Sequence, residues 1–119
     1  MKKTLVLGAS TNPTRVSYQA VYRLLSKGHE PVLVGIKKGD IAGIPIQHGQ
    51  PELSDIDTIT LYMNPRRQVD QYDYILGLHP KRIIFNPGTE NPELMRLARE
   101  QGIEIDIACT LVMLATDQY

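Results

Sequence analysis

A chain of 119 residues with 42% hydrophobic and 22% charged residues has the size and composition of one globular domain, which argues against a disordered or fibrous class. Its 13 basic and 13 acidic residues cancel, so the broad positive field of a nucleic-acid or anionic-membrane binder is absent. One cysteine, Cys109, cannot form an internal disulfide, and the three scattered histidines have no zinc-ligand spacing, so we expect no structural metal.

The N-terminal apolar run Thr4–Leu7 is too short for the core of a signal peptide or for a membrane span. No repeat, linker or low-complexity tract interrupts the chain. We therefore expect one cytoplasmic domain over residues 1–119.

Apolar runs of strand length alternate with amphipathic stretches of helix length, which is the pattern of a parallel sheet built from βαβ units. We expect an α/β fold, a single doubly wound (Rossmann-like) domain with a mainly parallel five-stranded sheet. In chain order, the predicted elements are strand Lys3–Gly8, helix Ser17–Lys27, strand Pro31–Gly35, strand Thr58–Tyr62, a helix over residues 64–78, strand Arg82–Phe85, helix Pro92–Gln101, strand Ile103–Ile107 and a short helix within Cys109–Ala115.

Capping residues support the helix boundaries. Ser17 is a plausible N-cap of the first helix and Gly28 is well placed to end it. Asn64 followed by Pro65 predicts a cap and a first helical residue. The stretch Lys37–Gly49 is expected to be a loop that encloses a brief extended segment, Ile44–Ile46.

Doubly wound sheets bind ligands beyond the carboxyl ends of their strands, where the strand order switches. Three loops, at residues 8–15, 35–39 and 86–91, follow predicted strands at that edge. These loops are the candidates for a binding site.

The first loop has the features of a phosphate site. Gly8 is followed by small and polar residues up to a helix, so backbone N–H groups and the positive helix end can converge on a phosphate. Arg15 could add a charge-assisted contact to a pyrophosphate. The loop matches neither G-x-G-x-x-G nor the P-loop pattern, and an ordinary strand-to-helix turn is the alternative.

The second loop carries lysines where NAD-binding sheets have an acidic residue for the ribose hydroxyls. Lys37 and Lys38 instead favour a nucleotide with an extra ribose phosphate, either coenzyme A or NADP, and disfavour NAD. Two solvated lysines in a turn are the alternative.

The third loop and Cys109 give weaker signals. Glu90 is the loop's only ionisable group, and a carboxylate near a helix start more often stabilises the helix than acts as a base. Cys109 follows the last strand and is either a core residue or a thiol near the ligand. The histidines have no partner at a spacing that supports a catalytic triad.

Over nearly its whole length the sequence resembles the small stand-alone CoA-binding proteins, which share the fold of the N-terminal domain in the succinyl-CoA synthetase alpha subunit. The resemblance is carried by Gly8-Ala9-Ser10-Thr11-Asn12-Pro13 with Arg15 and Ser17, by Gly35-Ile36-Lys37-Lys38-Gly39 leading into Ala42-Gly43-Ile44-Pro45, by Asp55-Ile56-Asp57 and by Asn86-Pro87-Gly88-Thr89. The synthetase uses a phosphorylated histidine on a later domain, so the resemblance implies binding and no ligase activity.

By this resemblance, Ala9 to Asn12 would line the pyrophosphate and Lys37 would approach the ribose phosphate, while Tyr62, Asn64 and residues 86–88 would border the adenine or pantetheine path. The expected coenzyme A site has no catalytic and no metal-binding residue. Its members are Gly8, Ala9, Ser10, Thr11, Asn12, Pro13, Arg15, Lys37, Lys38, Tyr62, Asn64, Asn86, Pro87 and Gly88.

The sequence therefore predicts a non-catalytic or accessory protein that binds coenzyme A or an acyl-CoA, with no nucleic-acid or membrane partner. An NADP-dependent reductase is one alternative. A thiol redox module in which Cys109 forms a mixed disulfide with coenzyme A is another. A homo-oligomer or a synthetase-like partner is compatible with either.

Overall fold

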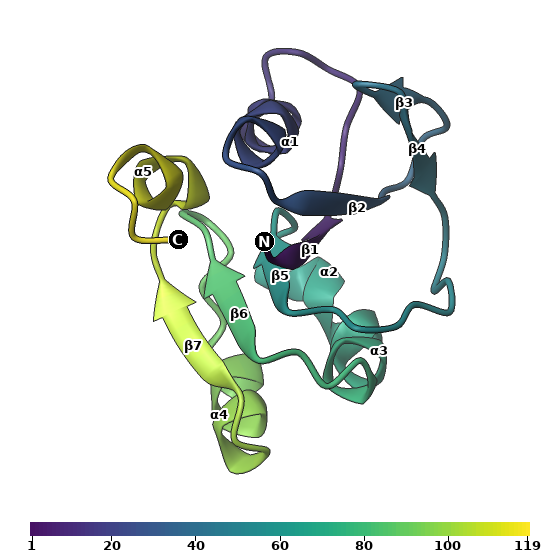
Figure 1. Ribbon diagram of the computed structural model, residues 1–119. Helices are drawn as coiled ribbons and strands as arrows, with labels where there is room; N and C mark the ends of the chain where they lie inside the picture. The colour runs from purple at the N-terminus through teal and green to yellow at the C-terminus, as the bar shows by residue number, and fades with distance from the viewer.

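The computed structural model describes residues 1–119 as one seven-stranded sheet between two layers of helices (Figure 1). The strands are β1 (Lys3–Leu7), β2 (Glu30–Val34), β3 (Asp40–Ile41), β4 (Ile44–Gln47), β5 (Thr58–Leu61), β6 (Arg82–Phe85) and β7 (Glu104–Ile107). The helices are α1 (Val16–Ser26), α2 (Pro65–Gln68), the 3₁₀ turn η1 (Val69–Gln71), α3 (Tyr72–Gly77), α4 (Pro92–Glu100) and α5 (Thr110–Ala115).

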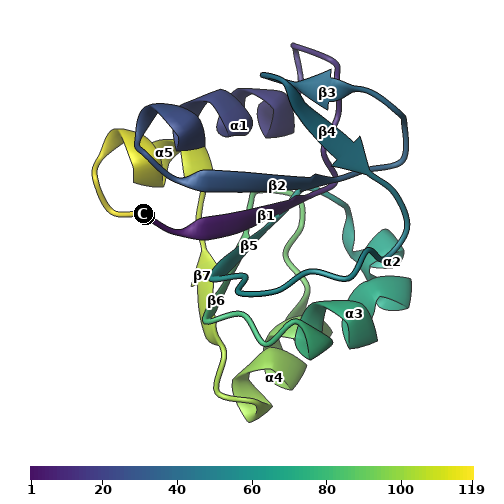
Figure 2. The same cartoon turned by 45° about the vertical axis from the view of Figure 1, so that its right-hand side comes forward.

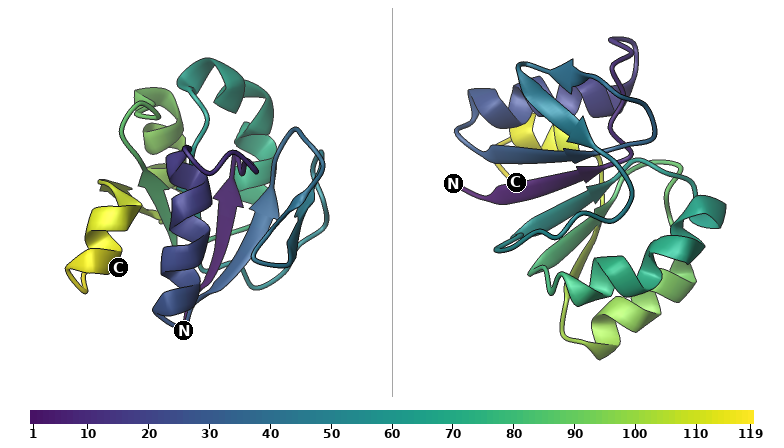
Figure 3. Two further views of the ribbon diagram at one scale, coloured as in Figure 1. Left: turned by 90° about the horizontal axis from the view of Figure 1, so that it is seen from above. Right: turned by 90° about the vertical axis from the view of Figure 1, so that its right-hand side faces the viewer.

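The sheet is mostly parallel and its order is β3-β4-β2-β1-β5-β6-β7. Only the pairing of β3 with β4 is antiparallel. Strand β1 lies between β2 and β5, with Leu5 opposite both Val32 and Ile59. The α/β doubly wound fold is confirmed, because helices cover both faces of this sheet (Figure 3).

The prediction of five strands is wrong, because the segment expected to be a loop contributes two more. Strands β3 and β4 form a hairpin within residues 37–49, and β4 joins the sheet through Leu33 opposite Ile46 and Val34 opposite Gln47. These strands have two and four residues, too few to display an alternating pattern. Strand β4 joins the sheet through its pairing with β2, 13 residues earlier in the sequence, and β3 joins it through β4.

The single helix predicted over residues 64–78 is divided into α2, η1 and α3. The division falls where Gln68 is fully buried and its neighbour Val69 is 54% exposed. A polar residue inside and an apolar one outside break the 3.6-residue period of a continuous helix. The Asn64 cap before Pro65 has the predicted geometry, since its Oδ1 accepts the N–H of Arg67 at 3.0 Å.

The start of α1 also differs from prediction. The N-cap is Arg15, which provides no side-chain cap, and Ser17 is a buried residue of the first turn. Gly28 does follow the helix with a positive φ, and His29 donates its backbone N–H to the Leu24 carbonyl at 2.9 Å, which closes the last turn.

Alternating residues of the central strands build two separate cores. On one face, Val6 and Leu33 pack with Val21 and Leu24 of α1 and with Leu114 of α5. On the other face, side chains of β1, β5 and β6 pack against α3 and α4. Figures 2 and 3 show the consequence, with α1 and α5 above the sheet and α2, α3 and α4 below it.

The C-terminal residue lies against the start of the sheet. The ring of Tyr119 lies 4.5 Å from the Arg82 guanidinium and 4.8 Å from the ring of His29. The backbone N–H of Lys2 donates to Nδ1 of His29 at 3.0 Å. Burial, with the positive charges of the N-terminus, Lys2 and Arg82, lowers the pKa of His29 below its ordinary value.

This arrangement predicts a pH dependence of stability. Because the folded-state pKa of His29 is depressed, the unfolded chain binds more protons as the pH falls through the ordinary histidine range. The free energy of unfolding is therefore unaffected by this histidine's protonation above about pH 6.5 and falls as the pH drops below that value. Urea unfolding of the wild type and of His29→Gln, from about pH 7.5 to about pH 5, should show a smaller loss of stability in the variant. Parallel curves for the two proteins would contradict this prediction.

Candidate functional site

A cleft of about 520 Å³ opens at the carboxyl ends of the central strands. This volume lies within the range of small-molecule sites. Residues from the loops after β1, β2 and β5 and from the start of α1 line it: Gly8, Ala9, Ser10, Thr11, Asn12, Arg15, Val16, Ser17, Ile36, Lys37, Tyr62 and Arg67. The strand order switches at β1, which lies between β2 and β5. The helix that follows β1, α1, covers one face of the sheet, and the helix that follows β5, α2, lies on the other (Figure 3, right).

The floor of the cleft is held by close contact between two loops. The N–H groups of Gly8 and Ala9 both donate to the carbonyl of Val34 at 2.9 Å. The loop after β1 then passes so close to Gly35 that a Cβ added there would lie 2.3 Å from the Ala9 carbonyl oxygen. A residue without a side chain at position 35 is therefore required by the path of the neighbouring backbone.

The loop between β1 and α1 presents unpaired N–H groups to the cleft. Within the loop, the Ser10 hydroxyl accepts the N–H of Asn12 at 3.1 Å, and Asn12 Oδ1 accepts the N–H of Thr14 at 3.0 Å. At the helix start, the N–H groups of Val16 and Ser17 have no acceptor, because Arg15 provides no side-chain cap. Free N–H groups at the positive end of a helix favour an anion.

The charged residues that line the cleft are all cationic. Arg15, Lys37 and Arg67 are exposed, and no carboxylate is among the lining residues. None of the three takes part in an ion pair. In a chain of zero net charge, this local excess of positive charge favours an anionic ligand with several phosphates.

Tyr62 borders the cleft with part of its side chain and buries its hydroxyl in the protein. Burial raises the pKa of Tyr62 to about 12. The hydroxyl has no hydrogen-bond partner, and the nearby Thr60 and Thr110 hydroxyls bond to each other at 2.8 Å. Tyr62 therefore remains a neutral phenol at neutral pH, so it adds contact area to the cleft and no charge.

The structure brings together eight of the residues predicted for the site and separates the other six from the cleft lining. Those that line the cleft are Gly8, Ala9, Ser10, Thr11, Asn12, Arg15, Lys37 and Tyr62. Those that do not are Pro13, Lys38, Asn64, Asn86, Pro87 and Gly88. Four further residues line the cleft and were not predicted as ligand contacts: Val16, Ser17, Ile36 and Arg67. The Asn64-Pro65 cap could have indicated Arg67, because it sets the start of α2 at this edge of the sheet.

Several polar residues of the third loop have structural partners. Asn86 is buried and donates to Thr60 Oγ1 and the Leu61 carbonyl at 2.7 and 2.8 Å, while its Oδ1 accepts the N–H of Thr110. The Glu90 carboxylate accepts the N–H of Gly88 at 2.8 Å, which stabilises the turn. Cys109 is half-buried at the N-cap of α5 and does not line the cleft.

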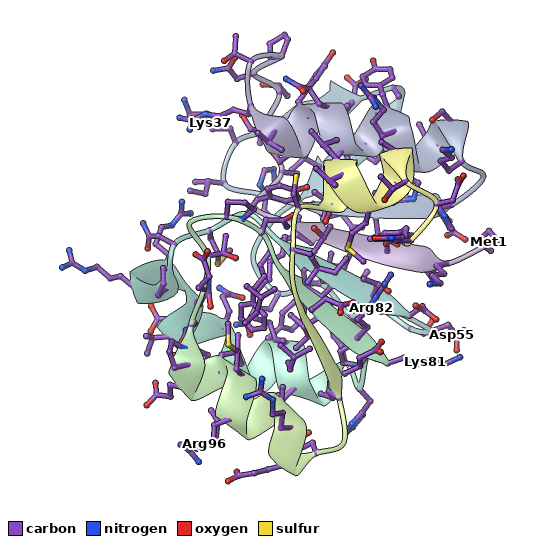
Figure 4. All side chains as sticks on the ribbon, turned by 90° about the vertical axis from the view of Figure 1, so that its left-hand side faces the viewer. Met1, Lys37, Asp55, Lys81, Arg82 and Arg96 are labelled. Atoms are coloured by element: carbon purple, nitrogen blue, oxygen red, sulfur yellow. The ribbon has the colours of Figure 1, made fainter.

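A second hollow of about 570 Å³ lies at the opposite, amino edge of the sheet. It is lined by Met1, Lys3, Glu30, Asp55, Ile56, Asp57, His79 and Lys81. Its lining includes both acidic and basic side chains, and Lys81 Nζ lies 3.9 Å from a carboxylate oxygen of Asp57. Figure 4 shows Lys37 and Lys81 at opposite ends of the molecule. Ligands of doubly wound sheets bind at the carboxyl edge, so we assign the candidate site to the cationic cleft.

Two general properties of the molecule also bear on its function. None of its helices combines the length and apolar character needed to cross a bilayer. No group of three or more histidine, cysteine, aspartate or glutamate side chains is arranged to hold a metal ion.

The fold is that of a Rossmann-like domain, and its cationic cleft is the candidate binding site. A model of the CoA binding domain family matches residues 2–115, and the chain belongs to this family. Membership supports coenzyme A binding as the general function. No curated protein matches the chain.

Solved structures resemble the chain over most or all of its length. One, described as an uncharacterized protein, is 52% identical, has a TM-score of 0.98, and is aligned over 100% of this chain and 98% of its own. A protein from Thermus thermophilus is 20% identical with a TM-score of 0.86, over 99% of this chain and 90% of its own, and so supports the fold alone. A conserved hypothetical protein from Pyrococcus furiosus is 26% identical with a TM-score of 0.76, over 89% of this chain and 92% of its own.

The close contact at Gly35 predicts that a single methyl group disturbs the cleft. In Gly35→Ala the new Cβ must displace the backbone of Ala9, so we expect a loss of about 1–3 kcal/mol in the free energy of unfolding. Gly77→Ala in α3 is the matched control, because nothing lies within 4 Å of a Cβ at that position, and its stability should be unchanged or slightly raised. Urea denaturation compares the two, and equal stability of both variants would refute the role of Gly35.

Proposed function

We propose that this protein binds coenzyme A or an acyl-CoA in the cleft between the loops after β1, β2 and β5, as an accessory protein without catalytic activity of its own. The observation that carries the proposal is the cationic lining of the cleft, with Arg15, Lys37 and Arg67 present and no carboxylate. Family membership supports coenzyme A as the ligand.

The order of the loops suggests where each part of the ligand would lie. The pyrophosphate would lie on the loop of residues 8–12 and the start of α1, where the free N–H groups of Val16 and Ser17 are located. The adenosine would lie toward the end of β2, as in other doubly wound sheets. There the exposed side chain of Ile36 offers an apolar surface, and Lys37 offers a charge for the ribose 3′-phosphate.

The lining also supports an accessory role. General acid–base catalysis needs a group that exchanges protons near neutral pH, usually a histidine or a carboxylate. The titratable residues at the cleft are Arg15, Lys37, Arg67 and Tyr62, and the phenol of Tyr62, with its pKa of about 12, stays protonated. These groups can bind and orient a ligand.

Calorimetric titration with coenzyme A, 3′-dephospho-coenzyme A and NADP tests this function. We expect coenzyme A to bind most tightly and the 3′-dephospho form to bind more weakly, because the latter lacks the phosphate that we propose Lys37 contacts. Tighter binding of NADP, with turnover of a nicotinamide substrate, would favour a reductase. Absence of coenzyme A binding would refute the proposal.

The role of Lys37 can be measured separately. Lys37→Ala should weaken coenzyme A binding by on the order of tenfold, the loss expected for one charge-assisted hydrogen bond of about 1.5 kcal/mol. The affinity for 3′-dephospho-coenzyme A should change far less. Lys81→Ala at the amino edge removes the same charge far from the cleft and should leave both affinities unchanged (Figure 4). If Lys37→Ala lowers the affinity for the two ligands equally, the lysine does not recognise the 3′-phosphate.

A further inference from the structure

The three cations of the cleft follow the order of the strands beneath them. Lys37 comes after β2, Arg15 after β1 and Arg67 after β5, and these strands are neighbours in the sheet. Adjacent strands lie about 4.8 Å apart, so the ends of β2 and β5 are separated by roughly 10 Å. The positive charges thus form a row across the carboxyl edge.

Arg67 approaches the cleft from the side opposite Arg15. Arg15 precedes α1 on one face of the sheet, and Arg67 lies in α2 on the other (Figure 2). A phosphate over the end of β1 would therefore have an arginine on each side. The planar guanidinium suits this position, because it can donate two parallel hydrogen bonds to one phosphate.

The short helix that carries Arg67 is fixed to the rest of the protein. The neighbouring Gln68 is fully buried, and its Nε2 donates to the carbonyls of Met63 and Thr89 at 2.9 and 2.8 Å. Its Oε1 accepts from Asn91 Nδ2 at 2.9 Å. The backbone N–H of Arg67 is held by the Asn64 cap, while its side chain is exposed and makes no ion pair. A rigid backbone thus presents a free guanidinium to the cleft.

We infer that Arg67 is a ligand-binding residue that recognises the β-phosphate of the coenzyme A pyrophosphate, the phosphate farther from the ribose. This inference rests on the function proposed above, which places the adenosine toward β2. A pyrophosphate that continues from there past β1 brings its distal phosphate nearest to the end of β5, where Arg67 is located. Arg15 and the loop of residues 8–12 then remain for the phosphate nearer the ribose.

Arg66 provides a matched control within the same helix. It has the same charge and is also exposed, but it does not line the cleft. Successive helical residues point about 100° apart, so Arg66 and Arg67 face different directions. Arg66→Ala and Arg67→Ala change the net charge equally, and any difference between them reports a direct contact.

The test measures the affinity of wild type, Arg67→Ala and Arg66→Ala for three ligands by calorimetry: coenzyme A, adenosine 3′-phosphate 5′-diphosphate and adenosine 3′,5′-bisphosphate. The last two differ only in the β-phosphate. Arg67→Ala should lose about tenfold for the two ligands that carry a β-phosphate and less than about twofold for the bisphosphate. Arg66→Ala should stay within about twofold of wild type for all three. Thermal unfolding of each variant should match the wild type, because both side chains are exposed.

Each outcome decides one question. If wild type binds coenzyme A and the two variants behave alike, the assignment of Arg67 is wrong while the proposed function stands. If Arg67→Ala weakens all three ligands equally, Arg67 does not recognise the β-phosphate. If wild type binds none of the ligands, the proposed function itself fails.

Discussion

The parallel pairing of β1 with β2 and β5 is the constraint on which the other features depend. Because the three strands run in one direction and in register, their carboxyl ends reach the same edge of the sheet. The chain leaves β1 toward α1 on one face and leaves β5 toward α2 on the other, so the two connections diverge above the strand ends. The cleft is the space that this divergence leaves, and both cores are built from the alternating side chains of the same strands.

Two kinds of contact keep the cleft in shape. The glycine at position 35 lets the backbone of Ala9 lie directly against β2, which no other residue type would allow. Below, buried polar side chains join the loops to one another: Asn86 links β5 to the start of α5, and Gln68 links α2 to the loop after β6. Buried groups with satisfied hydrogen bonds tolerate little movement, since a lost partner leaves a costly unpaired atom. The exposed cations are therefore held on a rigid base.

The electrostatics of the cleft follow from this geometry rather than from composition. The chain has no net charge, yet the positions that follow β1, β2 and β5 bring Arg15, Lys37 and Arg67 to one opening. Acidic residues lie at the far, amino edge of the sheet, where Asp57 pairs with Lys81. A multiply phosphorylated nucleotide is the class of ligand that matches a row of unpaired cations beside free backbone N–H groups.

The sequence by itself determined the α/β class, the whole of β6, and four other strands to within one residue at each end. Short apolar runs that contain β-branched residues favour strands locally, and capping pairs such as Asn64-Pro65 set helix starts locally. It also predicted that the loop after β1 and Lys37 lie at the carboxyl edge of the sheet, where both line the cleft. Strand ends and charged residues can be recognised in the sequence alone. Only the tertiary structure decided that residues 40–47 join the sheet and that a buried Gln68 interrupts the helix after Asn64. It also decided that the Asn86 side chain forms hydrogen bonds within the protein. The pairing of β4 with β2 and the hydrogen bonds from Gln68 to Thr89 and from Asn86 to Thr60 join residues 13 or more positions apart, for which no local pattern exists. The Asn64 cap places Arg67 in the first turn of α2, but the position of this turn beside the cleft depends on the fold of the whole chain.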